Sequence, residues 1–511
     1  VSEKIIQSSK STEVESGPNT VDWTIYPTAV VHRLHHNFGL FPHYATDNAE
    51  KSKDNNDPYK KLSIPKNFHI IIAISSNLPP ASGLSTSSAF VTGIFLVLDS
   101  HLGLHRTESY RRAIGVRRTE NYTLLANDKD ECDDIYGEDE VYNLSTYLGN
   151  VENGQDYVMT RHQSQKKDPI VLKGTAGVGT FGGSEDHAAI LMGKQGQLRL
   201  LSFCPTRPAS FRFRSNGHDI GDVSVTSCEV DEDERSYDLI YQGSVVHMPP
   251  DLAFVVAYSG TKAEKAGGVD GATAASEGYN NASELARKAL DAYLFGEGTN
   301  RDDELEMKTL ADAVRWERRR LGIRSTSGMG IMQQSDKIKK CISDQICSRE
   351  STANEERGAE AVDSSENYRT ILVQRFEQFY DESEFLVPTA AYALENEKYE
   401  MLGSIVDKSH QGAVNILRNQ IEETAWLPLS ARGMKDQYSG SSSSTSPQFS
   451  STPVKAFAAS AFGAGFGGSC WALVCRNRAR HFARQWLNSF NSAFPPGSSG
   501  LHREFFVTEP G

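Results

Sequence analysis

The chain has 511 residues, a length that predicts two or three domains and excludes a small scaffold held together by disulfides. Apolar residues make up 38% of it and charged residues 23%, with 23 Phe and 19 Tyr, which is enough for a globular core with polar insertions. The net charge of −13 and the lack of a basic stripe argue against nucleic acid as a partner, because an acidic surface repels the phosphate backbone.

Membranes and disulfide bonds are also not expected. No apolar run approaches the ~20 residues of a membrane span, so the sequence predicts a soluble protein without a membrane partner. The 7 cysteines are odd in number, dispersed and free of CxxC pairs, which favours reduced thiols in the cytoplasm. The oligomeric state is left open.

The amino-terminal half begins its regular pattern at a β-branched run. Residues 68–74 predict a strand, the small residues that follow predict a loop, and an apolar stretch beginning near Ala89 predicts a helix. The charged segment 125–167 predicts a long surface excursion. Glycine-rich sequence at 174–196 then runs into an apolar stretch, and a strand is expected over 198–201.

In the carboxyl-terminal half, helical patterns predominate between two strands. The strands are expected over 252–258 and 471–475. Apolar periodicity predicts helices over 283–294, 304–320, 368–380 and 413–424. Two polar stretches are interpreted as insertions, residues 322–367 and the Ser-rich tract 438–452, and the second is expected to be mobile.

The first candidate site is a run of small residues between the predicted strand and helix. Small side chains let backbone N–H groups approach a phosphate, hydroxyls can bond phosphate oxygens or Mg²⁺, and the helix that follows presents its positive end. A flexible Ser-rich linker is the alternative, but linkers rarely join an Ile-rich strand to an apolar helix. No Gly-Lys-Ser/Thr follows, so the run is not a Walker loop. The sequence therefore predicts a phosphate cradle formed by Pro79, Ser82, Gly83, Leu84, Ser85, Thr86, Ser87, Ser88 and Ala89.

A second candidate site follows the glycine pair Gly182-Gly183. Asp186 stands just after this turn at the start of an apolar segment, where a carboxylate can accept a proton from a substrate hydroxyl. A carboxylate there can equally cap a helix, and the residues alone leave both interpretations open. The third candidate is the glycine-rich run 461–471, in which Gly463 and Gly465 allow close backbone approach to a phosphate or a sugar.

These three segments, in this order, resemble the motifs of the GHMP kinases, a superfamily named for galactokinase, homoserine kinase, mevalonate kinase and phosphomevalonate kinase. Residues 78–89 resemble its second motif, with Thr86 in place of a usual serine, and residues 461–471 resemble its third. Galactokinases carry Gly-Gly-x-x-Asp-Gln or a similar sequence where this chain has 182–187. The resemblance covers about residues 20–480 apart from the insertions.

The resemblance implies an α+β fold of two domains, a ribosomal S5 domain 2-like N-terminal domain and a ferredoxin-like C-terminal domain. They are expected over 1–215 and 216–511, the second with insertions near 322–367 and 438–452. The implied reaction is transfer of the γ-phosphate of ATP to the anomeric hydroxyl of a hexose, with galactose favoured. The implied cofactors are ATP and Mg²⁺, and the implied partner is a small-molecule sugar.

The resemblance also implies roles for single residues. Asp186 is the implied catalytic base, and Ser87 is the implied serine that contacts the metal. The glutamate that completes the metal site is either Glu152 or Glu120, and we favour Glu152 because it lies closer to Asp186 in the chain. The sugar is implied to lie against Gly182, Gly183, Asp186, Gly463 and Gly465.

Departures from the galactokinase pattern leave alternatives open. Glu185 and His187 replace a usual hydrophobic residue and a Gln, so arabinose, fucose and heptose are alternative substrates. A non-catalytic regulator that senses galactose and ATP is a further alternative, although the complete run 83–89 favours an enzyme. The first motif of galactokinases, Gly-Arg-x-Asn-x-x-Gly-Glu-His, is missing and the chain starts at Val1, so we expect a truncated sequence that phosphorylates sugar slowly or not at all.

Overall fold

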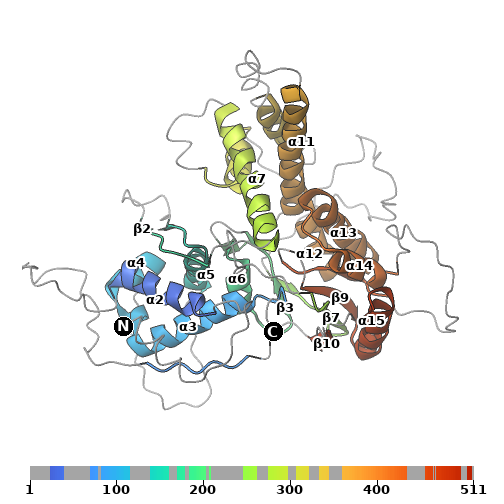
Figure 1. Cartoon of the computed structure of the whole chain (residues 1–511), viewed down its shortest axis with the longest axis horizontal. Coiled ribbons are helices and arrows are strands. Elements are labelled where there is room, and N and C mark those ends of the chain that lie inside the picture. The colour runs from blue at the N-terminus through green and yellow to red at the C-terminus, as the bar shows by residue number, and fades with distance from the viewer. Residues whose placement is uncertain are drawn as a thin grey trace, which may run out of the picture.

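The structure is a computed structural model that shows helices and strands in three groups (Figure 1). Amino-terminal helices lie at the lower left of this view, two long helices project upward, and a sheet with its covering helices lies at the lower right. Among the described residues, no helix combines the length and the apolarity that a membrane crossing requires. The structure describes residues 23–39, 70–76, 78, 82–115, 138–159, 170–178, 183–202, 206–208, 245–261, 274–296, 307–321, 333–344, 360–433, 455–463, 465, 468–495 and 503–508.

The amino-terminal helices pack around one core. They are α2 Ile25–Phe38, α3 Thr86–Leu102, α4 Glu108–Ile114 and α5 Glu138–Asn153, with the 3-10 turn η2 Leu104–Arg106 between α3 and α4. Leu34, Phe95 and Tyr147 are fully buried at the centre of this core. The helix α6 Glu185–Met192 packs against α3 and α5, and β1 Tyr157–Met159 pairs with β2 Ile170–Leu172.

Two expectations for this half are wrong. Residues 70–76 lack the ladder hydrogen bonds of a strand, and Ile71 is 95% exposed, because no neighbouring strand lies beside them among the described residues. The segment 125–167 is not a surface excursion throughout, since it contains α5. One face of that helix enters the core with Leu144, Tyr147, Leu148 and Val151.

An antiparallel 4-stranded sheet, in the order β10-β7-β9-β8, forms the centre of the carboxyl-terminal part. Its strands are β7 Leu252–Tyr258, β8 Ala458–Ala461, β9 Ser469–Cys475 and β10 Glu504–Thr508. The helices α14 Glu422–Ala431 and α15 Ala479–Ala493 cover one face, and α12 Val387–Glu395 and α13 Tyr399–Gly412 cover the other. Because both faces are covered, β7 is apolar throughout and β9 is apolar after Ser469, and the strands predicted at 252–258 and 471–475 are confirmed.

Shorter strands precede this sheet. β3 Gln197–Arg199 pairs with β6 Val245–His247, and β4 Leu201–Ser202 pairs with β5 Arg207–Pro208. The strand predicted over 198–201 is therefore confirmed in two pieces.

The two long helices of Figure 1 are α7 Ala274–Gly296 and α11 Glu360–Asp381, which pack against each other. With α9 Leu310–Arg320 and a helix over 333–344 they enclose a core that contains Tyr293, Val314 and Phe376. The helices predicted over 283–294 and 368–380 are confirmed, and the one predicted over 304–320 is confirmed from Leu310 onward.

Of the remaining expectations for this half, some are wrong and others lie outside the described residues. The predicted helix 413–424 is wrong, because the π-helical turn η5 Ala413–Leu417 ends at Arg418 with a φ of 51° and α14 begins only at Glu422. A second π-helical turn, η4 Glu382–Leu386, joins α11 to α12. The polar stretch 322–367 contains the helix 333–344, whose Ile338 and Ile342 are buried. The tract 438–452 and the expected domain boundary at residue 215 lie outside the described residues.

Candidate active site

The loop before α3 has the backbone geometry of a cradle. Gly83 and Ser85 have positive φ values of 73° and 56°, and α3 begins directly after Ser85. A non-glycine residue in the left-handed region is strained, and such strain concentrates at functional sites. The side chain of Ser85 makes no capping hydrogen bond to α3. Because the first N–H groups of a helix have no partner within the helix, this end of α3 suits an anionic ligand.

Ser88 brings two carboxylates together. Its hydroxyl donates to Glu152 Oε2 at 2.8 Å and lies 3.5 Å from Asp186 Oδ2. The three residues come from α3, α5 and α6. Ser88 and Glu152 are 2% and 7% exposed, whereas Asp186 is half-buried. A hydroxyl has one proton, so the shorter contact binds it to Glu152 and leaves Asp186 as the accessible acceptor.

His187 lies on the other side of Glu152. Its Nε2 is 3.1 Å from Glu152 Oε2, and the imidazole is 2% exposed. Neither ring nitrogen has the alignment of a hydrogen bond, so the contact acts between the carboxylate and the ring as charge and dipole. Burial by itself raises the pKa of Glu152, but the contact with His187 and the hydroxyls of Ser88 and Ser87 outweigh it and hold that pKa below its usual value. Glu152 is therefore a buried carboxylate kept ionised by its neighbours.

The start of β9 contacts the cradle directly. Ser469 Oγ donates to the carbonyl oxygen of Ser82 at 2.8 Å, and Ser259 Oγ donates to the carbonyl oxygen of Gly468 at 2.8 Å. Gly468 has a φ of 85°, and an added Cβ would overlap the Ser82 carbonyl oxygen. The approach of β9 to the cradle therefore requires glycine at this position.

The structure describes most of the predicted site residues, but it does not bring all of them together. The structure brings the cradle residues 82–89 together with Glu152 and Asp186, and Ser87 also acts on the Glu152 carboxylate. Gly463 and Gly465 have positive φ values of 54° and 76°, and Gly465 packs against Asn419. Gly183 lies beside the carboxylate of Glu185. Pro79, Glu120 and Gly182 lie outside the described residues.

Three contacts were missed by the sequence analysis. Ser88 was placed only in the phosphate cradle, yet its hydroxyl joins the two carboxylates. His187 was treated as a departure near the sugar, yet it faces Glu152. Ser469 was not selected, although a hydroxyl directly after a glycine pair at the start of a strand is a signal that could have been used.

The donor set around Ser88 fits Mg²⁺. This ion is held in phosphate-transferring sites by one or two carboxylates, hydroxyls and the phosphates of the substrate rather than by a closed protein cage. Glu152, Asp186 and Ser88 supply that set beside the amino end of α3. Within the described part of the chain, no cluster of three or more His, Cys, Asp and Glu side chains is arranged to hold a metal by itself.

Residues 50–124 match the family model of the GHMP kinases N terminal domain. This match confirms the resemblance to the GHMP kinase superfamily. The matched stretch contains the cradle with α3 and α4, whereas Glu152, Asp186 and the run 461–471 lie outside it. The mixed helices and strands agree with the expected α+β class.

No curated protein sequence matches the chain. Among solved structures, galactokinase of Lactococcus lactis complexed with galactose is similar at 14% identity and a TM-score of 0.40, over 85% of this chain and 67% of that one.

Proposed function

We propose that the chain is an ATP-dependent sugar kinase that transfers the γ-phosphate of ATP to the anomeric hydroxyl of a hexose. The observation that carries the proposal is the cluster of Ser88, Glu152 and Asp186 at the amino end of α3. It places an accessible carboxylate and a buried ionised one beside a helix end suited to phosphate. Phosphoryl transfer needs positioning and charge neutralisation more than covalent chemistry, and these groups supply both.

Each part of the cluster has a separate task in this reaction. The cradle 82–89 and the first turn of α3 hold the phosphates through backbone N–H groups. Asp186 accepts a hydrogen bond from the sugar hydroxyl and takes its proton as the phosphate is transferred. Glu152 and Ser88, with Ser87, form the protein side of a Mg²⁺ site. Mg²⁺ supplies neutralisation of the phosphate charge when it is bound.

Galactose is the proposed sugar, on the resemblance of the second, third and Gly-Gly-x-x-Asp segments to galactokinases. His187 was the main departure from that pattern. Because its imidazole is buried against Glu152, the change bears on the metal carboxylate rather than on the sugar. Glu185 is exposed and remains the residue whose replacement bears on the alternative substrates arabinose, fucose and heptose.

Product identification tests the proposal. The full chain is incubated with ATP, Mg²⁺ and each sugar in turn, and phosphorylated products are identified by ³¹P NMR. We expect a sugar 1-phosphate, formed fastest from galactose. Phosphate on a hydroxyl other than the anomeric one would contradict the proposal. Binding of galactose and ATP without any phosphorylated sugar would instead favour the non-catalytic regulator.

A further inference from the structure

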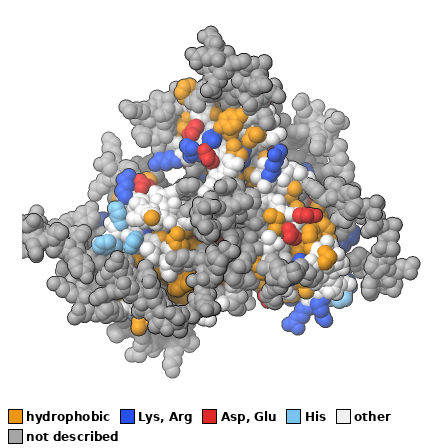
Figure 2. All heavy atoms as spheres, viewed as in Figure 1, with side chains coloured by type: hydrophobic (Ala, Val, Ile, Leu, Met, Phe, Trp, Pro, Cys, Tyr) orange, Lys and Arg blue, Asp and Glu red, His pale blue; other side chains and the backbone are white. Residues whose placement is uncertain are grey.

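A buried imidazole in the candidate active site has no hydrogen bond at either nitrogen. Histidine side chains are visible on the surface in Figure 2, but His187 is only 2% exposed. Among the described residues, neither its Nδ1 nor its Nε2 has a hydrogen-bond partner. Buried His410, by comparison, contacts the Ala425 carbonyl oxygen through Nε2 at 3.2 Å. A polar group left buried and unpaired costs free energy, so the position of His187 calls for an explanation.

The unpaired ring faces the carboxylate of Glu152. Its Nε2 lies 3.1 Å from Glu152 Oε2, and the Ser88 hydroxyl donates to the same oxygen at 2.8 Å. An ionised carboxylate only accepts hydrogen bonds, so the ring nitrogen that faces it is the one that carries the N–H. Two donors therefore approach Oε2, and neither of them takes up Oε1.

The start of α6 brings this ring to the site together with Asp186. His187 directly follows Asp186 in the first turn of the helix, and successive residues of a helix point about 100° apart. From this one turn, Asp186 Oδ2 comes within 3.5 Å of the Ser88 hydroxyl and His187 reaches Glu152. The ring beside the proposed metal carboxylate is thus held by the same turn as the proposed acceptor of the sugar proton.

We propose that His187 is a positioning residue of the candidate metal site, whose Nε2–H holds one oxygen of Glu152 so that the other faces the cation. This role rests on the proposed function, which makes Glu152 a metal ligand. Hydrogen bonds in active sites are often poorly aligned before the ligands bind, and the 3.1 Å contact is expected to align when the cation is bound. In the part of the chain that the structure describes, no three His, Cys, Asp and Glu side chains are arranged to hold a metal, so the ring acts through Glu152.

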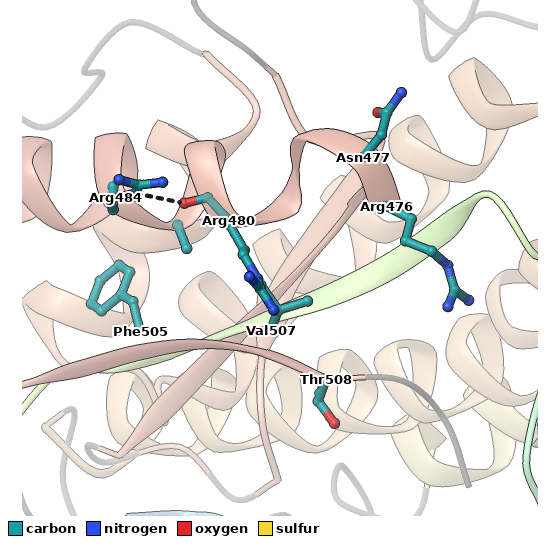
Figure 3. Close-up of a pocket in the computed structure, with 8 residues that line it drawn as sticks. Arg476, Asn477, Arg480, Arg484, Phe505, Val507 and Thr508 are labelled. Atoms are coloured by element: carbon teal, nitrogen blue, oxygen red, sulfur yellow. Dashed lines mark hydrogen bonds between the residues drawn. The ribbon is translucent and has the colours of Figure 1, made fainter.

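The pocket drawn in Figure 3 is separate from this site. It lies between α15 and β10 and is lined by residues that include Arg480 and Phe505. Ser469 at the start of β9 contacts the cradle, whereas Arg476 of the pocket follows the other end of the same strand. β9 has 7 residues, so its two ends are roughly 20 Å apart at ~3.3 Å per residue. A ligand in that pocket would not report on His187.

Binding of the ATP analogue AMP-PNP to the full chain, measured by calorimetry with Mg²⁺ and then with EDTA, tests the proposal without turnover. The ratio of the two affinities gives the contribution of Mg²⁺. His187→Phe keeps a buried ring but removes both nitrogens, and we expect it to lower this ratio about tenfold while the affinity in EDTA stays within about twofold of wild type. His187→Gln restores an N–H donor and should recover most of the ratio. His187→Leu, a second nitrogen-free variant, is measured in parallel with the same expectation as His187→Phe.

His105→Phe is the matched control, because it removes the same kind of contact outside the candidate site. His105 Nδ1 lies 3.0 Å from Asp99 Oδ1, and Asp99 is roughly 17 Å from Ser88 along α3 at ~1.5 Å per residue. This control should leave the affinity ratio unchanged.

The outcomes separate the role of His187 from the proposed function. An undiminished ratio in the nitrogen-free variants, an equal loss in His105→Phe, or no recovery in His187→Gln would overturn the role of His187. Absence of a Mg²⁺ effect in the wild type would contradict the proposed function itself, and the role of His187 with it.

Discussion

Glu152 is the residue on which the candidate active site depends most. A buried carboxylate is costly unless neighbours stabilise its charge, and here Ser88 and His187 do so at 2.8 and 3.1 Å. A carboxylate held ionised in this way is ready to bind a cation. Ser88 joins Glu152 to Asp186, so the proposed cation ligand and the proposed acceptor of the sugar proton share one hydroxyl.

Replacement of Glu152 by Gln tests this coupling. The change keeps the size and the contact with Ser88 but removes the charge, so we expect the Mg²⁺ concentration for half-maximal turnover to rise on the order of 10-fold or more. The rate of sugar phosphorylation, measured over a series of Mg²⁺ concentrations, gives this half-maximal concentration. Glu120→Gln is the matched control and should change the Mg²⁺ requirement less. The opposite order of effects would assign the metal site to Glu120.

The pH dependence of stability tests the same network without metal. Because the folded state holds the pKa of Glu152 below its unfolded value, ionised Glu152 stabilises the fold at neutral pH, and this contribution is lost as pH falls through the folded pKa. The difference in unfolding free energy between wild type and Glu152→Gln should be constant from pH 7 to about 5 and shrink below that. Denaturant unfolding in metal-free buffer measures it. A difference that grows toward acid pH would show that His187 and Ser88 do not stabilise the charge.

For single residues, the sequence indicated which side chains belong to the candidate site, but it did not indicate which of them contact one another. Asp186 and Glu152 could be selected because each follows a recognisable pattern, but their meeting at Ser88 depends on how α3, α5 and α6 pack. No spacing along the chain indicates that His187 faces Glu152 rather than the substrate.

At the scale of elements, the start of β9 fixes the position of the cradle. Gly468→Ala should weaken ATP binding on the order of tenfold, the effect of ~1.4 kcal/mol, because a Cβ would displace Ser82. Gly196→Ala is the matched control, since Gly196 also has positive φ, nothing lies within 4 Å of an added Cβ, and the residue is outside the candidate site. This control should lower the free energy of unfolding by only ~1–2 kcal/mol, the cost of placing a side chain at positive φ, and should leave ATP affinity unchanged. Equal ATP affinity in both variants would show that β9 does not support the cradle.

The elements also show why some segments could be predicted and others could not. β7 and β9 are covered on both faces, so their apolar runs are continuous and were found. The helix α5 was not predicted, because the acidic residues that precede it are typical of a surface segment. Its buried residues nevertheless have helical spacing: Leu144, Tyr147, Leu148 and Val151. The turn at Arg418 has no glycine or proline to mark it, so a continuous helix was predicted there.

At the scale of the whole molecule, the candidate site is assembled from both halves of the chain. The amino-terminal helices supply Ser88, Glu152 and Asp186, and the carboxyl-terminal sheet holds the cradle through Ser469. This arrangement explains why the three glycine- and serine-rich segments, far apart in the sequence, belong to one site. The function that we propose for this site depends on the accessible carboxylate of Asp186.

The rate of sugar phosphorylation by Asp186→Asn tests this account most directly. The matched control is Asp291→Asn, the same change at an exposed carboxylate of α7 outside the candidate site. With ATP, Mg²⁺ and galactose, we expect Asp186→Asn to lower kcat on the order of 10²-fold or more while ATP binding persists, and the control to retain most of its rate. A near-normal kcat in Asp186→Asn would contradict the central claim.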